Sequence, residues 1–144
     1  MIVLDTNIVS EPLKPKPDPE VLAWLDRQAP ETLYLTSISL AELSAGVEVL
    51  PAGKRRAALQ QAVGAQVPSL FQGRVLGFDH DAVLAFGRIA AKAQAAGNPI
   101  DFADCAIAAI ATTHRFILAT RNARDFKGTG CIFRPKVTGD SGGK

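Results

Sequence analysis

Apolar positions follow two patterns along this chain, short continuous runs and longer stretches with helical spacing. The short runs are rich in branched residues and are typical of buried strands. They predict strands over 2–4, 33–36, 74–78, 116–119 and 131–133. In the longer stretches apolar residues recur every three or four positions, which predicts helices over 19–28, 39–50, 54–63, 81–96 and 101–114. Strands separated by helices need crossover connections, so we expect an α/β fold with a mostly parallel sheet of about five short strands flanked by helices.

A chain of 144 residues with 47% hydrophobic and 21% charged residues has the size and mixture of one globular domain with a single core. No repeat or long linker divides it, because the segment 12–19, which holds four prolines, is short enough to be a loop. We therefore predict one domain over 1–134. The polar segment 135–144 is predicted to be a disordered tail.

The composition also bears on the compartment in which the chain folds. Cys105 lies in an apolar run and Cys131 beside an isoleucine, positions typical of buried thiols rather than of a disulfide framework or a Cys/His metal site. The N-terminal segment has an acid at position 5 and no basic leader, and no apolar run approaches the roughly 20 residues that span a bilayer. We expect a cytoplasmic protein with no signal peptide and no membrane partner.

The net charge of +2 is spread unevenly along the chain. Residues 1–48 hold eight acids and three bases, whereas residues 115–136 hold six bases and one acid. The basic segment could face a polyanion, although Lys and Arg on helices more often form a solvated surface.

Three acids stand where strands give way to helices, and each has a structural interpretation as a capping group. Asp5 directly follows the first strand and suits a helix N-cap. Ser39 and Glu42 have the spacing of a capping box, in which the glutamate reaches back to the serine amide. Asp101 suits the N-cap of the last helix, with Asp104 in its first turn.

Taken together, Asp5, Glu42 and Asp104 favour a shared site. Asp104 opens an almost wholly apolar helix, which must be central, and the ends of parallel strands meet at one edge of a sheet. Two like charges ~4 Å apart repel by about 4 kcal/mol at an effective dielectric constant of 20, so grouped carboxylates need a cation or a proton. Carboxylates suit Mg²⁺ or Mn²⁺, and His80 and His114 lie outside the group and give no zinc spacing.

The loop after the 116–119 strand adds polar groups to this edge. It holds three groups that could orient a metal-bound water and two arginines that could bind phosphate: Thr120, Asn122 and Asp125, with Arg121 and Arg124. A structural interpretation of the same loop is that Asn122 caps a short helical turn and Phe126 folds back onto the core.

Four motifs in order resemble the PIN-domain family, and within it the VapC-type (FitB-like) toxins of toxin–antitoxin pairs. They lie at 2–10 around Asp5-Thr6-Asn7, at 37–46 around Glu42, at 101–111 around Asp104 and at 120–126. The resemblance covers about 1–134 and implies a PIN-like three-layer fold. It also implies an endoribonuclease that depends on Mg²⁺ or Mn²⁺, is held inactive by a cognate antitoxin, and forms a homodimer.

By motif position the resemblance implies that Asp5, Glu42 and Asp104 form the metal-binding triad, with Thr6 as the adjacent hydroxyl. The fourth polar position falls in the loop at 122–125. Many relatives have aspartate where this chain has Asn122, so the choice between Asn122 and Asp125 stays open.

For this fourth position we favour Asn122 holding a water and Asp125 acting from the outer shell, since positions three apart share a face of a helical turn. The alternative is that Asp125 pairs with Arg121 or Arg124 at the surface.

Two other functions are alternatives to a ribonuclease. A phosphorylation-type receiver domain also has an acidic Mg²⁺ pocket, but it would show paired acids after the first strand. A catalytically silent PIN-like binding module would keep the fold without cleaving RNA.

Alanine-rich helices at 81–96 and 101–114 offer close-packing faces for the implied homodimer, or they fill the core of a single chain.

Overall fold

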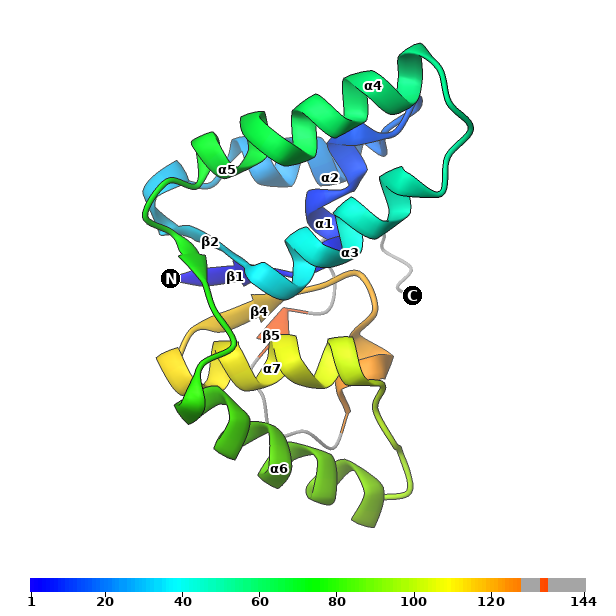
Figure 1. Ribbon diagram of the computed structural model, residues 1–144. Helices are drawn as coiled ribbons and strands as arrows, with labels where there is room; N and C mark the ends of the chain where they lie inside the picture. Colours follow the sequence, from blue (N-terminus) through cyan, green and yellow to red (C-terminus); the bar gives the residue numbers. More distant parts are fainter. Residues whose placement is uncertain (128–132, 135–144) are drawn as a thin grey trace.

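A five-stranded parallel sheet forms the centre of the molecule, seen in a computed structural model that describes residues 1–127 and 133–134. Its strands are β1 (Ile2–Leu4), β2 (Leu33–Thr36), β3 (Val75–Leu76), β4 (Ile117–Ala119) and β5 (Phe133–Arg134). They lie in the order β3-β2-β1-β4-β5, and every neighbouring pair is parallel. The predicted α/β class is confirmed, and β1 occupies the middle of the sheet (Figure 1).

All five predicted helices are present, with ends that differ by a few residues. The helices are α1 (Thr6–Val9), α2 (Pro19–Asp26), α3 (Ser37–Glu48), α4 (Lys54–Gln61), α5 (Val67–Leu70), α6 (His80–Ala95) and α7 (Phe102–His114). Short 3-10 turns lie at η1 (Glu11–Leu13), η2 (Pro30–Thr32) and η4 (Ala123–Phe126), and a π-helical segment, η3, spans Ala62–Gln66.

The helix predicted over 54–63 is longer than expected, because η3 joins α4 to α5. Pro68 stands near the start of α5 and has no amide hydrogen to donate to the carbonyl four residues earlier. In η3 the amide of Val67 instead donates to the carbonyl of Ala62, five residues back. A wide π turn therefore carries the chain past the proline.

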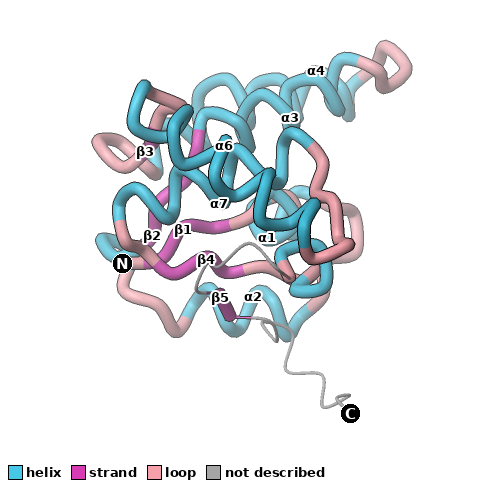
Figure 2. Tube along the Cα trace, turned by 90° about the horizontal axis from the view of Figure 1, so that it is seen from below, coloured by secondary structure: helices cyan, strands magenta, loops and turns pink. Residues whose placement is uncertain are grey.

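Helices cover both faces of the sheet, and the alternation of side chains along β1 explains the division. Ile2 and Leu4 enter one core cluster, which includes apolar residues of α1, α2, α3 and the α4–α5 segment. Val3 enters the other cluster, which includes residues of α6 and α7. Successive residues of a strand point to opposite faces. Figure 2 shows α6 and α7 side by side across the strands.

Helix α7 is the central helix that the sequence predicts. Its seven residues from Cys105 to Ala111 are all buried. Cys105 is a free, buried thiol, as predicted, whereas Cys131 and the tail over 135–144 lie outside the described residues. Within the described part of the chain, no helix combines the length and apolarity needed to cross a membrane.

The predicted capping box at Ser39 is wrong. Helix α3 begins at Ser37, and its N-cap is Thr36, whose side chain accepts a hydrogen bond from the amide of Ser39 at 3.1 Å. Ser39 is therefore inside the helix, and Glu42 is free to contact another element. The cap at Asp101 is confirmed, since its carboxylate accepts from the amide of Asp104 at 2.8 Å.

Candidate active site

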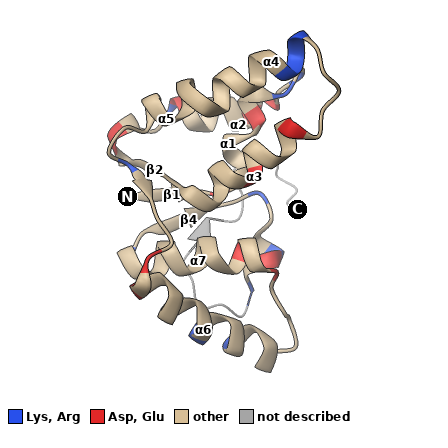
Figure 3. Cartoon of the chain, viewed as in Figure 1, with Lys and Arg blue, Asp and Glu red and all other residues tan. Residues whose placement is uncertain are grey.

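Four acids that are far apart in the sequence lie at the same edge of the sheet, beyond the carboxyl ends of the central strands. Asp5 follows β1 directly, Glu42 lies in α3 after β2, and Asp125 lies in η4 after β4. Asp104 lies in the first turn of α7. Figure 3 shows acidic residues, in red, at the start of α7. This edge is where ligands bind in parallel α/β sheets.

Asp5 is the most enclosed of the four acids, with 4% of its surface exposed. One carboxylate oxygen accepts from the amide of Thr6 at 2.8 Å, which confirms the capping interpretation. The other accepts from the hydroxyl of Thr120 at 2.7 Å. Burial raises the pKa of Asp5 above 3.8, and Glu42 and Asp125 raise it further, against the lowering effect of the two hydrogen bonds.

Thr6 links Asp5 to Glu42, because its backbone amide bonds the first acid and its hydroxyl the second. Its hydroxyl donates to Glu42 Oε1 at 2.6 Å and lies 2.8 Å from Ser39 Oγ. Ser39 is fully buried and is held in turn by its contacts with Thr36. The exposed carboxylate of Glu42 is therefore oriented by a buried hydroxyl network that extends from the end of β2 to the start of α1.

Asp104 is half-buried and lies within the field of every other acid at this edge. Burial raises its pKa from 3.8 to about 7, and the negative charges of Asp101, Asp5, Asp125 and Glu42 add to the rise. Shifts of this size from burial and like charges are common at functional sites. The negative charge of Asp104 is therefore unfavourable in these surroundings.

The chemistry of these side chains fits a hard divalent cation, which prefers carboxylate oxygens. Asp5, Glu42 and Asp104 are the residues that could hold one, and the charge of the cation would relieve the repulsion that raises their pKa values. Among residues 1–127, no three Asp, Glu, His or Cys side chains already stand close enough to share one ion. His80 opens α6 and His114 closes α7, at the opposite end of that helix from Asp104.

The loop after β4 contains a buried part and an exposed part. Thr120 is fully buried, and besides donating to Asp5 it accepts from the amide of Asn122 at 2.9 Å. Asn122 and Asp125 are exposed. The predicted helical turn is present as η4, and Phe126 is buried in the core as expected. Asn122 stands at the N-cap position of η4, but its side chain makes no capping hydrogen bond.

Asp125 belongs to a polar cavity beside Asp104 rather than to a surface ion pair. The cavity has a volume of about 310 Å³, and Arg124 also lines it. No ion pair of the described residues joins Asp125 to Arg121 or Arg124. Asp125 thus lies beside Asp104, and its charge contributes to the raised pKa of Asp5.

The two arginines proposed to bind phosphate differ in their surroundings. The guanidinium of Arg121 is directed at carboxylates, with Nη1 2.7 Å from Glu11 Oε1 and Nη2 3.0 Å from Asp18 Oδ2. That geometry disagrees with a phosphate contact for Arg121. The guanidinium of Arg124 has no ion pair within residues 1–127 and lines the cavity beside Asp104.

Sequence reasoning missed three residues that support the site. Asn7 Oδ1 accepts from the amide of Arg121 at 3.3 Å, Ser39 contacts Thr6, and Glu11 binds Arg121. Asn7 stands in the Asp5-Thr6-Asn7 motif, which could have singled it out. Ser39 and Glu11 carry no local signal, because their partners lie 33 and 110 residues away.

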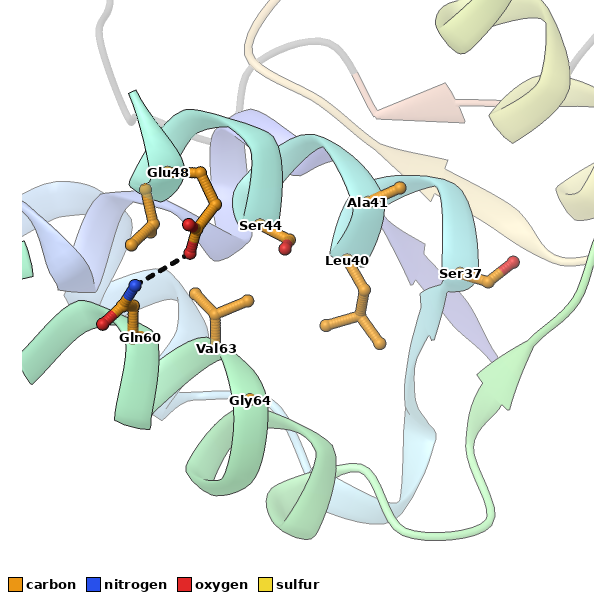
Figure 4. Close-up of a pocket in the computed structure, with 9 residues that line it drawn as sticks. Ser37, Leu40, Ala41, Ser44, Glu48, Gln60, Val63 and Gly64 are labelled. Carbon is orange, nitrogen blue, oxygen red and sulfur yellow. Dashed lines mark hydrogen bonds between the residues drawn. The ribbon is translucent and has the colours of Figure 1, made fainter. Parts of the chain in front are cut away.

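A separate cavity of about 350 Å³ lies between α3 and the α4–η3 segment (Figure 4). Leu40 and Val63 line it, and at one end Glu48 accepts from Gln60 at 2.9 Å. By helical spacing its α3 residues lie on the side of the helix opposite Glu42. This cavity is therefore distinct from the acidic cluster.

The sequence profile of the PIN domain matches residues 2–130. This chain belongs to the PIN-domain family. It is 47% identical over 130 residues to the VapC ribonuclease Y4jK of Sinorhizobium fredii, covering 90% of this chain and 93% of that protein. It is 41% identical over 126 residues to the toxin FitB of Neisseria gonorrhoeae, covering 88% and 91%. A solved structure of FitAB bound to a DNA fragment has a TM-score of 0.88 at 38% identity, covering 93% and 94%.

These comparisons confirm the resemblance to VapC-type, FitB-like PIN domains. They exclude the receiver-domain alternative, because the PIN profile spans all four acidic positions of the cluster. The acids of the candidate site are thus acids of a PIN domain whose relatives include a ribonuclease and a toxin.

Proposed function

We propose that this PIN-domain protein is a metal-dependent endoribonuclease and the toxin of a type II toxin–antitoxin pair. The observation that carries the proposal is the cluster around Asp104, where burial and four neighbouring carboxylates raise the pKa to about 7. Such a cluster is stabilised when a divalent cation binds it. The identity of 47% with a VapC ribonuclease supports RNA as the substrate.

Different residues of the chain have different roles in the proposed phosphodiester hydrolysis. Asp5 and Asp104, with Glu42, would hold Mg²⁺ or Mn²⁺, which when bound makes water a better nucleophile and neutralises charge on the attacked phosphate. Thr120 and the amide of Thr6 hold the carboxylate of Asp5 in one orientation. Burial and the neighbouring acids raise the pKa of Asp104 to about 7, so a bound cation would favour its carboxylate form.

The loop after β4 supplies the remaining polar groups. The exposed amide of Asn122 holds a water, and Asp125 acts on the cluster from the outer shell. Arg124 lies at the same cavity as Asp104 and Asp125, and its guanidinium, which forms no ion pair with residues 1–127, suits a substrate phosphate. The basic character of residues 115–136 supports a polyanionic substrate. We expect cleavage in single-stranded regions of structured RNA in the cytoplasm.

Cleavage assays with matched acid variants test this function. Purified protein should cleave RNA with Mg²⁺ or Mn²⁺ and stop with EDTA, and Asp5→Asn and Asp104→Asn should each abolish cleavage. Asp26→Asn is the control, because Asp26 is exposed on α2 and forms no ion pair with the described residues. Undiminished cleavage by both site variants would defeat the assignment. An inactive wild-type protein with either metal would favour the catalytically silent binding module.

A cognate antitoxin is the expected protein partner. The solved complex of FitAB supports such a partner for this chain. A hollow of about 210 Å³ next to the acids is lined by Glu42 together with Leu13, Leu43 and Arg55. An antitoxin segment lying there would place a basic side chain over the acidic cluster. The product of a neighbouring small reading frame should bind the protein and inhibit cleavage, and failure of every neighbouring product to bind would contradict the toxin role.

Of the two alanine-rich helices expected to pair in a homodimer, only α6 presents an exposed apolar face among the described residues. The alanines of α7 from Ala106 to Ala111 fill the core of their own chain, so they are not a pairing face. On the outer side of α6, Val83 is 47% and Leu84 51% exposed, and Phe102 is 62% exposed at the start of α7. We assign the dimer contact to this surface. Light scattering should show a dimer that Leu84→Lys dissociates, and a 15.2 kDa wild-type monomer at micromolar concentration would contradict it.

A further inference from the structure

Glu11 is a buried carboxylate outside the acidic cluster, and it is fully paired. It is 3% exposed, and it contacts Lys14 Nζ at 2.9 Å and Arg121 Nη1 at 2.7 Å. Its second oxygen accepts from the amide of Asp18 at 2.8 Å. Buried acids of this kind are rare unless they are paired, because loss of hydration must be offset by close partners.

Arg121 joins this ion cluster to the loop after β4. Besides its bond to Glu11, its guanidinium contacts Asp18 Oδ2 at 3.0 Å, so two acids hold the planar group. The backbone amide of the same residue donates to Asn7 Oδ1 at 3.3 Å. Arg121 is therefore attached at three points to the segment that runs from α1 through the proline-rich loop to the N-cap of α2.

The residue next to Arg121 holds the most buried acid of the candidate site. Thr120 donates to Asp5 Oδ2 at 2.7 Å, and its hydroxyl also accepts from the amide of Asn122 at 2.9 Å. Thr120 and Arg121 share a peptide bond, so fixing one restricts the backbone of the other. A continuous chain of contacts thus connects Glu11 to Asp5 without any contact between Glu11 and the acidic cluster.

We propose that Glu11 and Arg121 form a positioning clamp, which sets the orientation of Thr120 and through it the carboxylate of Asp5. Neither residue touches substrate or metal, and Arg121 acts on the loop rather than on phosphate. The inference rests on the proposed function, because the purpose of orienting Asp5 is to bind a divalent cation. Outer-shell groups that orient a ligand typically change metal affinity about 10- to 100-fold.

Binding of Mn²⁺ to the purified full chain, measured by calorimetry, is the main test. Arg121→Met should weaken Mn²⁺ binding about 10- to 100-fold, and Glu11→Gln should weaken it less, because Asp18 still holds the guanidinium. Lys14→Met is the matched control. Lys14 contacts the same carboxylate of Glu11 but no residue of the loop after β4, so its loss should leave Mn²⁺ affinity within about twofold of wild type.

A thermodynamic cycle separates positioning from general stabilisation. If the clamp acts through Thr120, Arg121→Met should have little further effect on Mn²⁺ affinity in a Thr120→Val background. Hydrogen exchange of the metal-free protein gives a second readout, since the amide of Asn122 should exchange faster in Arg121→Met and as in wild type in Lys14→Met. Arg121→Lys keeps the charge without the planar fork, and it takes the place of Arg121→Met if that variant does not fold.

The outcomes distinguish the clamp from the function on which it rests. A wild-type protein that neither binds Mn²⁺ nor cleaves RNA overturns the proposed function and the clamp with it. A wild-type protein that does both, together with an Arg121 variant of unchanged Mn²⁺ affinity, overturns the clamp alone. Effects of Arg121→Met and Thr120→Val that simply multiply also overturn it, because the two residues then act independently.

Discussion

Two carboxylates of this chain are buried to nearly the same degree in opposite surroundings. Glu11 is 3% and Asp5 4% exposed. The hydrogen bond from Lys14, the amide of Asp18 and the charge of Arg121 hold the pKa of Glu11 below 4.5. Among the described residues, Asp5 receives hydrogen bonds from neutral donors only, and burial raises its pKa above 3.8.

The two acids differ in whether the described part of the chain supplies a positive charge to balance them. Around Glu11 the positive partners are built into the fold, so its ionised form is stable in the folded protein. The charges that shift the pKa values of Asp5 and Asp104 are negative, so ionisation is unfavourable until a cation arrives. The first arrangement stabilises the fold, whereas the second favours binding of a cation, and four experiments test this contrast.

The largest expected effect comes from removing charge at the edge of the acidic cluster. Asp125→Asn should weaken Mg²⁺ affinity about 10- to 100-fold and slow cleavage without unfolding the protein, as losses from the outer shell commonly do. The measurement is calorimetric metal binding with a thermal melt, and Asp26→Asn is the control. Wild-type affinity and rate in Asp125→Asn would place Asp125 on the surface and leave three acids to hold the ion.

Stability should respond in opposite directions in the two regions. Glu11→Gln removes a charged acceptor that is fully paired, and we expect it to lower the free energy of unfolding by about 1–3 kcal/mol at neutral pH. Asp104→Asn removes a like charge from the metal-free cluster, so its free energy of unfolding should be unchanged or raised. Urea unfolding in EDTA measures both, with the exposed Glu31→Gln as control. Destabilisation by both variants would remove the contrast.

The fold was predictable from sequence where the signal is local. Strand β2 has the predicted bounds, and the buried helix α7 follows from its unbroken apolar run. The choice of N-cap for α3 was not predictable, because Thr36 and Ser39 are both capable caps and the end of β2 decides between them. The path of α4 beyond residue 63 depends on how a helix adapts to Pro68, which periodicity does not reveal.

The acids of the candidate site were predictable from sequence, but the contacts of the residues around them were not. Parallel topology brings Asp5 and Asp104 to one edge, where the charge of Asp5 contributes to the raised pKa of Asp104. The partners of Arg121 lie 110 and 103 residues away in sequence. From sequence alone, an arginine in a loop after a strand is as well suited to bind phosphate as to pair with an acid. Only in the folded chain does the proline-rich segment bring the carboxylates of Glu11 and Asp18 to Arg121.

The two regions should also differ in their dependence on pH. The pKa of Asp104 rises from 3.8 to about 7 on folding, so between these values the folded protein binds more protons than the unfolded chain. Its contribution therefore makes the metal-free protein less stable as the pH rises through that window. The contribution of Glu11 to stability depends on pH in the opposite direction. Its lowered pKa stabilises the folded protein at pH values above 4.5, and this stabilisation is lost as the pH falls through the pKa of Glu11 in the folded state.

Urea unfolding of wild type and Asp104→Asn at a series of pH values between 4 and 8 isolates the contribution of Asp104. The advantage of Asp104→Asn should grow from pH 4 to about 7 and then level off. Binding of Mn²⁺ to wild type should tighten by up to about tenfold per pH unit below that value, because the cation displaces a proton. Parallel stability profiles for the two proteins would show that Asp104 is ionised throughout.

The smallest expected effect tests which partner of Glu11 matters. The hydrogen bond from Lys14 is the largest single cause of the lowered pKa of Glu11, ahead of the charge of Arg121. The side chain of Lys14 is 54% exposed, however, whereas that of Arg121 is 26% exposed. Water screens an exposed ion pair and competes for its ammonium group, so such pairs contribute only about 0–1 kcal/mol. Lys14→Met should therefore lower the free energy of unfolding by less than about 1 kcal/mol, and Arg121→Met by more, when both are measured in urea with EDTA. Equal losses of unfolding free energy in the two variants would mean that exposure does not set the strength of these ion pairs. Glu11 would then depend on the exposed Lys14 as much as on Arg121.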